Sequence, residues 1–278
     1  MSYNAYGLLP YSSLLTTFPS PFDHFESPPV SDSQQSQLKL DNVWCEGDFT
    51  LVSAPEGRAE VHTLFRVRAD ELRSLSSKLA EVVDLCCSLA DSPRSMKFEE
   101  KPSVVRWFLN AGILRNDPKP SAMALATFAD VLKLARDLQC DALLSRLLSH
   151  LGEYAKIKST DPFHLFSVAC RFEQWQVCAL AIPLYRPGNK WYRDKTSTPI
   201  DLALGCKLGE YLLSPKALPY HLWMEIPKKC MWALLRSCED RTSWEERGER
   251  FFELMKLIET REIVYPYITE LEEDDPSE

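Results

Sequence analysis

The stretch that decides the fold is GDFTLVSAPEGRAEVH, residues 47–62. Its apolar residues Phe49 and Leu51 recur at every second position, which is the period of a β-strand. The PEG sequence at 55–57 predicts a turn, because proline presets φ and glycine accepts a positive φ. A second strand is expected over 59–65, at the spacing of a β-hairpin. The ordered part of the chain therefore opens with two paired strands.

Downstream of this hairpin, apolar residues recur at three- and four-residue steps, which is typical of amphipathic helices. The first helix is expected over about 70–90. A short third strand is expected over 95–100, followed by a helix over 103–112. Two consecutive helices are expected within 121–151. This first part of the chain is thus predicted to be α+β, a small sheet flanked by helices.

Strand patterns stop after Gly152, and the rest of the chain reads as helical. Asp161 and Pro162 predict a helix start, with Asp as the N-cap and Pro at the first helical position. Ser243 and Glu246 have the spacing of a capping box, which opens another helix. Further helices are expected over 200–213 and 227–238.

The composition of the two ends differs from that of the middle. Residues 1–40 are rich in Pro, Ser and Gln without periodicity, so we expect a disordered arm, whose aromatic residues are a candidate docking peptide. Residues 41–152 form the expected α+β domain. Residues 153–262 form the all-helical extension, which we expect to pack against it. Residues 263–278 form an acidic tail.

Charge and cysteine content restrict the class of protein. The net charge of −8 argues against a broad electrostatic hold on nucleic acid or anionic lipid, which depends on clustered Lys and Arg. The nine cysteines are scattered and odd in number, which favours reduced thiols over a disulfide framework. No signal peptide or membrane span is recognisable, so we expect a cytoplasmic or nuclear protein.

The sequence lacks the common motifs for catalysis and cofactor binding. The chain has no Gly-rich phosphate loop, no GxSxG elbow and no HExxH helix. None of its five histidines lies within four residues of a cysteine, so the ligand spacing of a zinc site is missing. We therefore expect no metal, no cofactor and no enzymatic activity. The alternative is a divergent intracellular enzyme with a Cys nucleophile, whose partners need only meet in space.

The order of these elements resembles the BTB/POZ domain. GDFTLVSAPEGRAEVH is similar to the opening hairpin of that family, in which an Asp begins the first strand and a His closes the second; here these are Asp48 and His62. The later strand of that family and the helix after it are similar to SMKFEEKPSVVRWFLNAGIL (95–114). The closing helix pair of the family is similar to FADVLKLARDLQCDALLSRLLSHL (128–151). The first post-domain helix pair of the BTB proteins abundant in fungi is similar to DPFHLFSVACRFEQWQVCALA (161–181).

This resemblance implies a non-enzymatic protein–protein interaction module, acting as a scaffold or adaptor or by self-association. It implies structural roles for Asp48, which fixes a strand start, and for His62, which holds the end of the hairpin. The protein partner is not identified by the sequence, and no direct contact with nucleic acid or membrane is expected.

The helix expected over 70–90 has more apolar positions than one covered face needs. We therefore predict a second contact along it. One hypothesis is a homodimer through this helix, and the other is a cap formed within one chain by the helical second half or by the aromatic arm. The candidate interface residues are Leu72, Leu75, Leu79, Val83 and Leu85.

Overall fold

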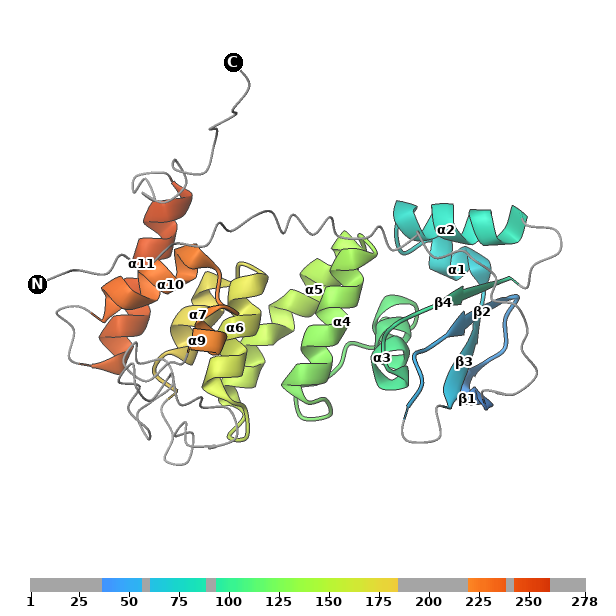
Figure 1. The fold of residues 1–278 in the computed structure, drawn as a ribbon, viewed down its shortest axis with the longest axis horizontal. Helices are drawn as coiled ribbons and strands as arrows, with labels where there is room; N and C mark the ends of the chain where they lie inside the picture. Colours follow the sequence, from blue (N-terminus) through green and yellow to red (C-terminus); the bar gives the residue numbers. More distant parts are fainter. Residues whose placement is uncertain (1–36, 57–60, 89–93, 185–219, 239–242, 261–278) are drawn as a thin grey trace, which may run out of the picture. The chain divides into compact units, whose positions relative to one another are not determined.

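The computed structural model of this 278-residue chain has the α+β architecture that the sequence predicts (Figure 1). It describes residues 37–56, 61–88, 94–184, 220–238 and 243–260. All of these belong to one compact unit, Gln37–Glu278. The aromatic arm, the acidic tail and the helix expected over 200–213 lie outside the described residues.

A four-stranded sheet with the order β1-β3-β2-β4 forms the first part of the unit. The hairpin strands β2 and β3 are antiparallel, while β1 runs parallel to β3 and β4 runs parallel to β2. The strands are β1 (Leu38–Cys45), β2 (Phe49–Val52), β3 (His62–Val67) and β4 (Ser95–Lys97). The expected hairpin and third strand are therefore present, with bounds that differ by a few residues.

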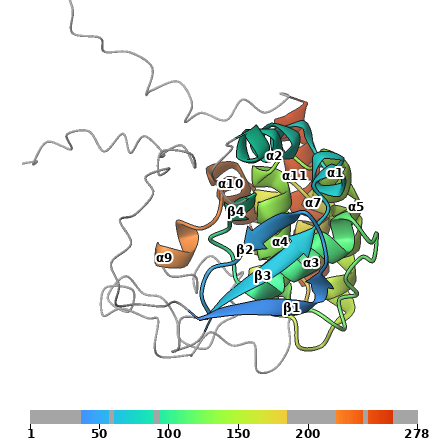
Figure 2. The ribbon, with the colours of Figure 1, turned by 90° about the vertical axis from the view of Figure 1, so that its right-hand side faces the viewer.

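One face of the sheet is covered by helices, and the described side chains of the other, outer face are half-buried or exposed. Phe49, Leu51, Phe65 and Val67 alternate along the hairpin and are fully buried, so they define the inner face. Figure 2 looks onto the sheet with helices α3 (Pro102–Gly112) and α4 (Leu125–Asp137) behind it, and α3 contacts β3. Burying these large side chains is the main favourable contribution to the fold of this part.

The single helix expected over 70–90 is wrong, because the structure has two helices there, α1 (Ala69–Arg73) and α2 (Ser77–Ser88). The break lies at Ser76. Its hydroxyl accepts a hydrogen bond from the backbone N–H of Leu79 (3.1 Å) and donates one to the carbonyl of Leu138 (2.7 Å). The serine therefore caps the start of α2 and ties it to the end of α4, a long-range contact that no local pattern reveals.

The first strand also begins earlier than the sequence predicts. We expected a disordered arm over 1–40 and the α+β domain from residue 41, whereas β1 begins at Leu38. Its residues Leu38, Lys39 and Leu40 pair with β3, and the register then shifts before Cys45 pairs again. One buried position of this strand holds a polar residue, Asp41. The alternation of apolar and polar residues that would predict a strand is therefore interrupted in the sequence.

The remaining helices form the second part of the unit. Asp161 caps α6 by accepting from the N–H of Phe163 (2.8 Å), and Ser243 and Glu246 form the predicted capping box of α11. Phe166 of α6 meets Phe251 of α11 with ring centroids 5.4 Å apart, and α6 also contacts α4. The further elements are α5 (Asp141–Leu151), the 3-10 turn η1 (Gly152–Lys156), α6 (Pro162–Arg171), α7 (Trp175–Ala181), α9 (Tyr220–Trp223), α10 (Lys228–Ser237) and α11 (Trp244–Glu259).

Candidate interaction surface

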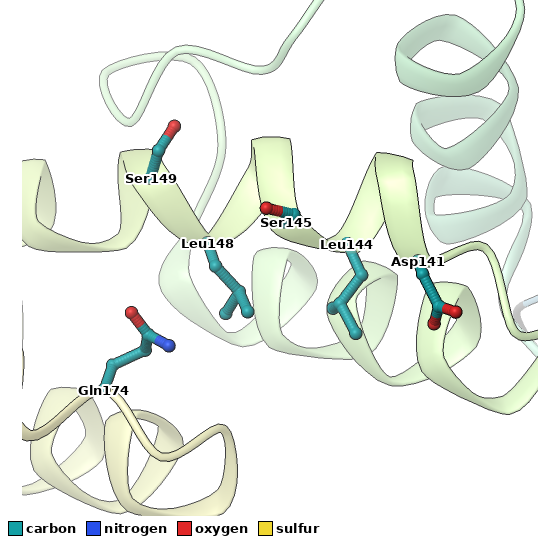
Figure 3. A pocket seen from close by; sticks show the side chains of 6 residues that line it. All are labelled: Asp141, Leu144, Ser145, Leu148, Ser149 and Gln174. Atoms are coloured by element: carbon teal, nitrogen blue, oxygen red, sulfur yellow. The ribbon is translucent and has the colours of Figure 1, made fainter.

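A surface hollow of about 410 Å³ lies between α5 and the turn that joins α6 to α7 (Figure 3). Leu144 and Leu148, one helical turn apart, give it a half-buried apolar floor. Its lining residues are Asp141, Leu144, Ser145, Leu148, Ser149 and Gln174. The carboxylate of Asp141 lies at one end of the hollow, and neither a histidine nor a cysteine lines it.

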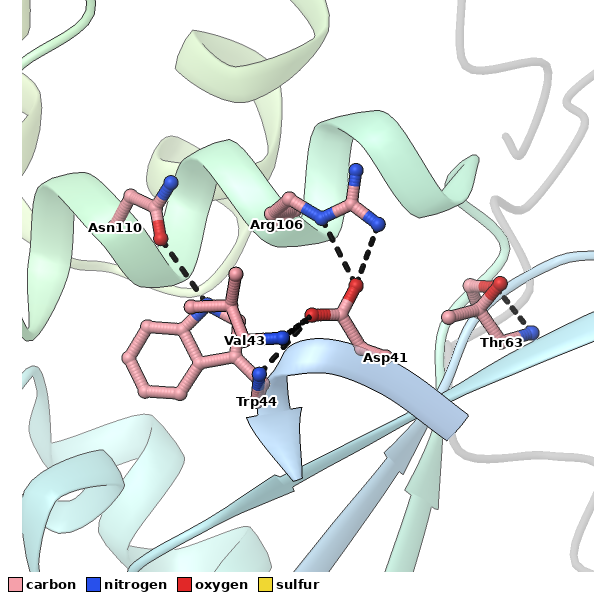
Figure 4. A network of polar contacts seen from close by, with 7 residues as sticks. Asp41, Val43, Trp44, Thr63, Arg106 and Asn110 are labelled. Carbon is pink, nitrogen blue, oxygen red and sulfur yellow. Dashed lines mark hydrogen bonds and ion pairs between the residues drawn. The ribbon is translucent and has the colours of Figure 1, made fainter. Parts of the chain in front are cut away.

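The first strand is fastened by a buried polar network (Figure 4). The side chain of Asp41 is fully buried and accepts hydrogen bonds from the N–H groups of Val43 (2.8 Å) and Trp44 (3.0 Å). The guanidinium of Arg106 on α3 donates to the same carboxylate from Nε (2.9 Å) and Nη2 (2.5 Å). The indole of Trp44 donates to Asn110, one turn further along α3 (3.1 Å). Together these bonds shape the irregular part of β1 and hold it on α3.

The charge state of Asp41 follows from this arrangement. Burial acts to raise its pKa, but the hydrogen bonds from Trp44, Arg106 and Val43 and the positive charge of Arg106 outweigh burial, and the pKa is lowered. The carboxylate therefore remains ionised at neutral pH, as its ion pair with Arg106 requires.

Fastening β1 in this way leaves three large apolar side chains exposed on it. Leu38, Leu40 and Val43 have 63%, 46% and 57% of their surface accessible. They are three of the eight large hydrophobic residues that are exposed in the described part of the chain, and the other five are spread over later elements. We call Leu38, Leu40 and Val43 the edge surface, because β1 is an end strand of the sheet.

The outer face of the sheet continues the edge surface. Leu40 pairs with Leu64 of β3, and Leu64 pairs with Val52 of β2, so the three side chains form one row across the outer face. Leu64 and Val52 are half-buried. Arg66 and Lys97, also on the outer face, are exposed. The outer face is thus apolar near β1 and positively charged at these two residues, in a chain of net charge −8.

The candidate interface residues of the first helical segment mostly face the interior of the chain. Leu72, Leu79 and Val83 are fully buried, and Leu75 is partly buried against the core. Leu85 is exposed, at 51% of its surface. Packing within one chain therefore occupies most of this stripe, and Leu85 is the member that remains accessible to a partner.

The two residues given structural roles make hydrogen bonds at the ends of the hairpin. Asp48 accepts from the backbone N–H of Ala69 (2.9 Å), which joins the start of β2 to the start of α1 and lowers the pKa of Asp48. The Nδ1 atom of His62 lies 2.8 Å from the carbonyl oxygen of Ser53, so this nitrogen is the donor. Both contacts stabilise the backbone. In each of them the side chain bonds a backbone group and not another side chain.

The thiols are candidate nucleophiles and metal ligands. None of the eight cysteines in the described residues is in a disulfide, and burial raises the pKa of Cys86 and raises that of Cys140 to about 11. This shift is the opposite of the one that activates a catalytic cysteine. Within the described ranges, no group of three or more His, Cys, Asp or Glu side chains could hold a metal ion. In the same part of the chain, no helix is both long and apolar enough to cross a membrane.

Comparisons with family models, with curated proteins and with solved structures found no match to this chain.

Proposed function

We propose that this chain is a non-enzymatic protein–protein interaction module of BTB/POZ type, serving as a scaffold or adaptor in the cytosol or nucleus. The order hairpin, helix, strand, helix, helix pair supports the family assignment. Free thiols support a reducing compartment. The partners are proteins, a second copy of this chain among them, and they bind through the edge surface.

The observation that carries this proposal is the exposure of Leu38, Leu40 and Val43 on a strand that the buried Asp41 joins to α3. Fully burying an aliphatic side chain contributes roughly 1.5–3 kcal/mol. Since each of these is already partly buried, a partner covering all three gains about 3 kcal/mol in total. Association costs at least about 4 kcal/mol in lost freedom.

The edge surface alone therefore cannot hold a partner. A stable interface must extend from it across the outer face of the sheet, over the row formed with Leu64 and Val52. When a second copy of the chain approaches from the β1 side, the edge surface of one copy contacts the edge surface of the other. This is the arrangement of a two-fold symmetric dimer.

Light scattering on the full chain at tens of micromolar tests the self-association. We expect a dimer for the wild type and a monomer for Leu40→Glu, because a charge at a desolvated contact is costly. Leu180→Glu is the matched control, because Leu180 on α7 is similarly exposed (52%) and far from β1 in sequence, and it should remain dimeric. A wild-type monomer, or equal masses for both variants, would refute self-association through this surface. Circular dichroism checks that each variant is folded.

A further inference from the structure

Three buried thiols meet where α6, α7 and α10 pack together. Cys170 of α6, Cys178 of α7 and Cys230 of α10 are at most 1% exposed. The Sγ atoms of Cys170 and Cys178 are 3.6 Å apart, and the thiols of Cys170 and Cys230 are close enough to shift each other's pKa. Cys170 therefore interacts with both other thiols, and the sulfur atom of Cys178 is the one that lies a short distance from that of Cys170.

The two sulfur atoms of this pair lie a short distance beyond the length of a disulfide bond. An S–S bond is about 2.05 Å long, so the two sulfur atoms must approach by about 1.5 Å. Both residues lie on short helices joined by a three-residue turn, and α6 and α7 contact each other. A change of side-chain rotamer, with a small adjustment of the turn, closes such a gap without separating the helices.

We infer that Cys170 and Cys178 are an oxidative modification site, at which a peroxide converts the two thiols into an intrachain disulfide. One sulfur attacks the peroxide, becomes a sulfenic acid and releases the first water. The second thiol attacks that sulfur, the S–S bond forms, and the hydroxyl leaves as the second water. Two thiols are oxidised by two electrons, and one peroxide is reduced. This site is independent of the edge surface.

The surroundings of the pair decide when it reacts. Burial raises the pKa of Cys170 and Cys178, while the hydrogen bond to Cys170, together with burial, raises that of Cys230. Because the thiolate is the reactive form, the packed helices protect these thiols. Oxidation must therefore pass through a local opening of the helical hairpin, after which the disulfide fixes α6 to α7.

Trypsin provides a direct readout, because it cuts between the three cysteines. Cys170 lies in peptide 159–171, Cys178 in peptide 172–190, and Cys230 in peptide 230–236. The full chain is treated with hydrogen peroxide, its remaining thiols are alkylated, and it is digested without reductant. We expect mass spectrometry to find peptide 159–171 linked to 172–190, and a reductant to abolish the link.

Three controls make the result decisive. Cys178→Ser must lose the link, and Cys87→Ser, which removes a half-buried thiol outside the cluster, must retain it. The same oxidation in concentrated urea should scatter the pairing over other cysteines. The inference is overturned if the folded protein links Cys170 to Cys230 instead, if both peptides are recovered alkylated, or if the link forms no more selectively in the folded chain than in urea.

Discussion

Replacing Arg106 by alanine should destabilise the protein by about 2 kcal/mol at pH 7. The substitution leaves the fully buried carboxylate of Asp41 with only its two backbone donors, Val43 and Trp44. Removing one partner of a fully buried ion pair costs about 3–5 kcal/mol. The side chain of Arg106 is 41% exposed, so water replaces part of what it provides, and the expected cost is correspondingly smaller.

The effect should depend on pH in a defined direction. The pKa of Asp41 is lower in the folded protein than its ordinary value of 3.8. A lowered pKa contributes stability that is present above the ordinary value and is lost as the pH falls through the folded value. The difference in unfolding free energy between the wild type and Arg106→Ala should therefore be constant from pH 7 to about pH 5 and should narrow below about pH 4.

Urea unfolding followed by far-UV circular dichroism measures both quantities. The matched control is Arg250→Ala, which removes an ion pair with Glu253 whose two side chains are 39% and 61% exposed, and which should cost less than about 0.5 kcal/mol. If Arg106→Ala falls within that same limit at pH 7, or if its cost does not shrink in acid, the buried network does not fasten β1 as described.

Three further substitutions test other parts of the account. Asp48→Ala removes the acceptor for the N–H of Ala69 and should cost about 1 kcal/mol, measured by urea unfolding. Gly47→Ala should destabilise more severely and lower the melting temperature, because Gly47 has φ of +152° and an added Cβ would clash with the backbone of Val67. Tyr154→Phe removes a buried hydroxyl that donates to a backbone carbonyl, and calorimetry should show a loss of about 1 kcal/mol. An unchanged stability would contradict the hydrogen bond of Asp48 or of Tyr154, or the close approach of Gly47 to Val67, for the respective variant.

Local signals predicted much of this fold. The hairpin follows from alternation at Phe49 and Leu51, and the starts of α6 and α11 follow from the capping residues Asp161 and Ser243. Each of these signals acts within a few residues, so one sequence is enough to show it.

The errors arose where distant contacts decide. Ser76 interrupts the first helix because it bonds to Leu138, sixty-two residues away. Asp41 is buried because Arg106, sixty-five residues away in sequence, pairs with it. In the sequence alone, the start of β1 therefore resembled the polar arm that precedes it. The interface predicted along the stripe at Leu72 remains a prediction, although three of its five members are buried within the chain. The edge surface was missed because its leucines precede the predicted start of order.

The claim that the edge surface binds proteins is tested most directly by quantitative affinity purification of the full chain. Wild type, Leu40→Glu and Leu180→Glu are compared at equal expression, with co-purified proteins measured by mass spectrometry. We predict that one set of proteins, including a differently tagged copy of the chain, is retained by the wild type and by Leu180→Glu and is lost from Leu40→Glu. The same proteins recovered in equal amounts with all three would contradict the claim.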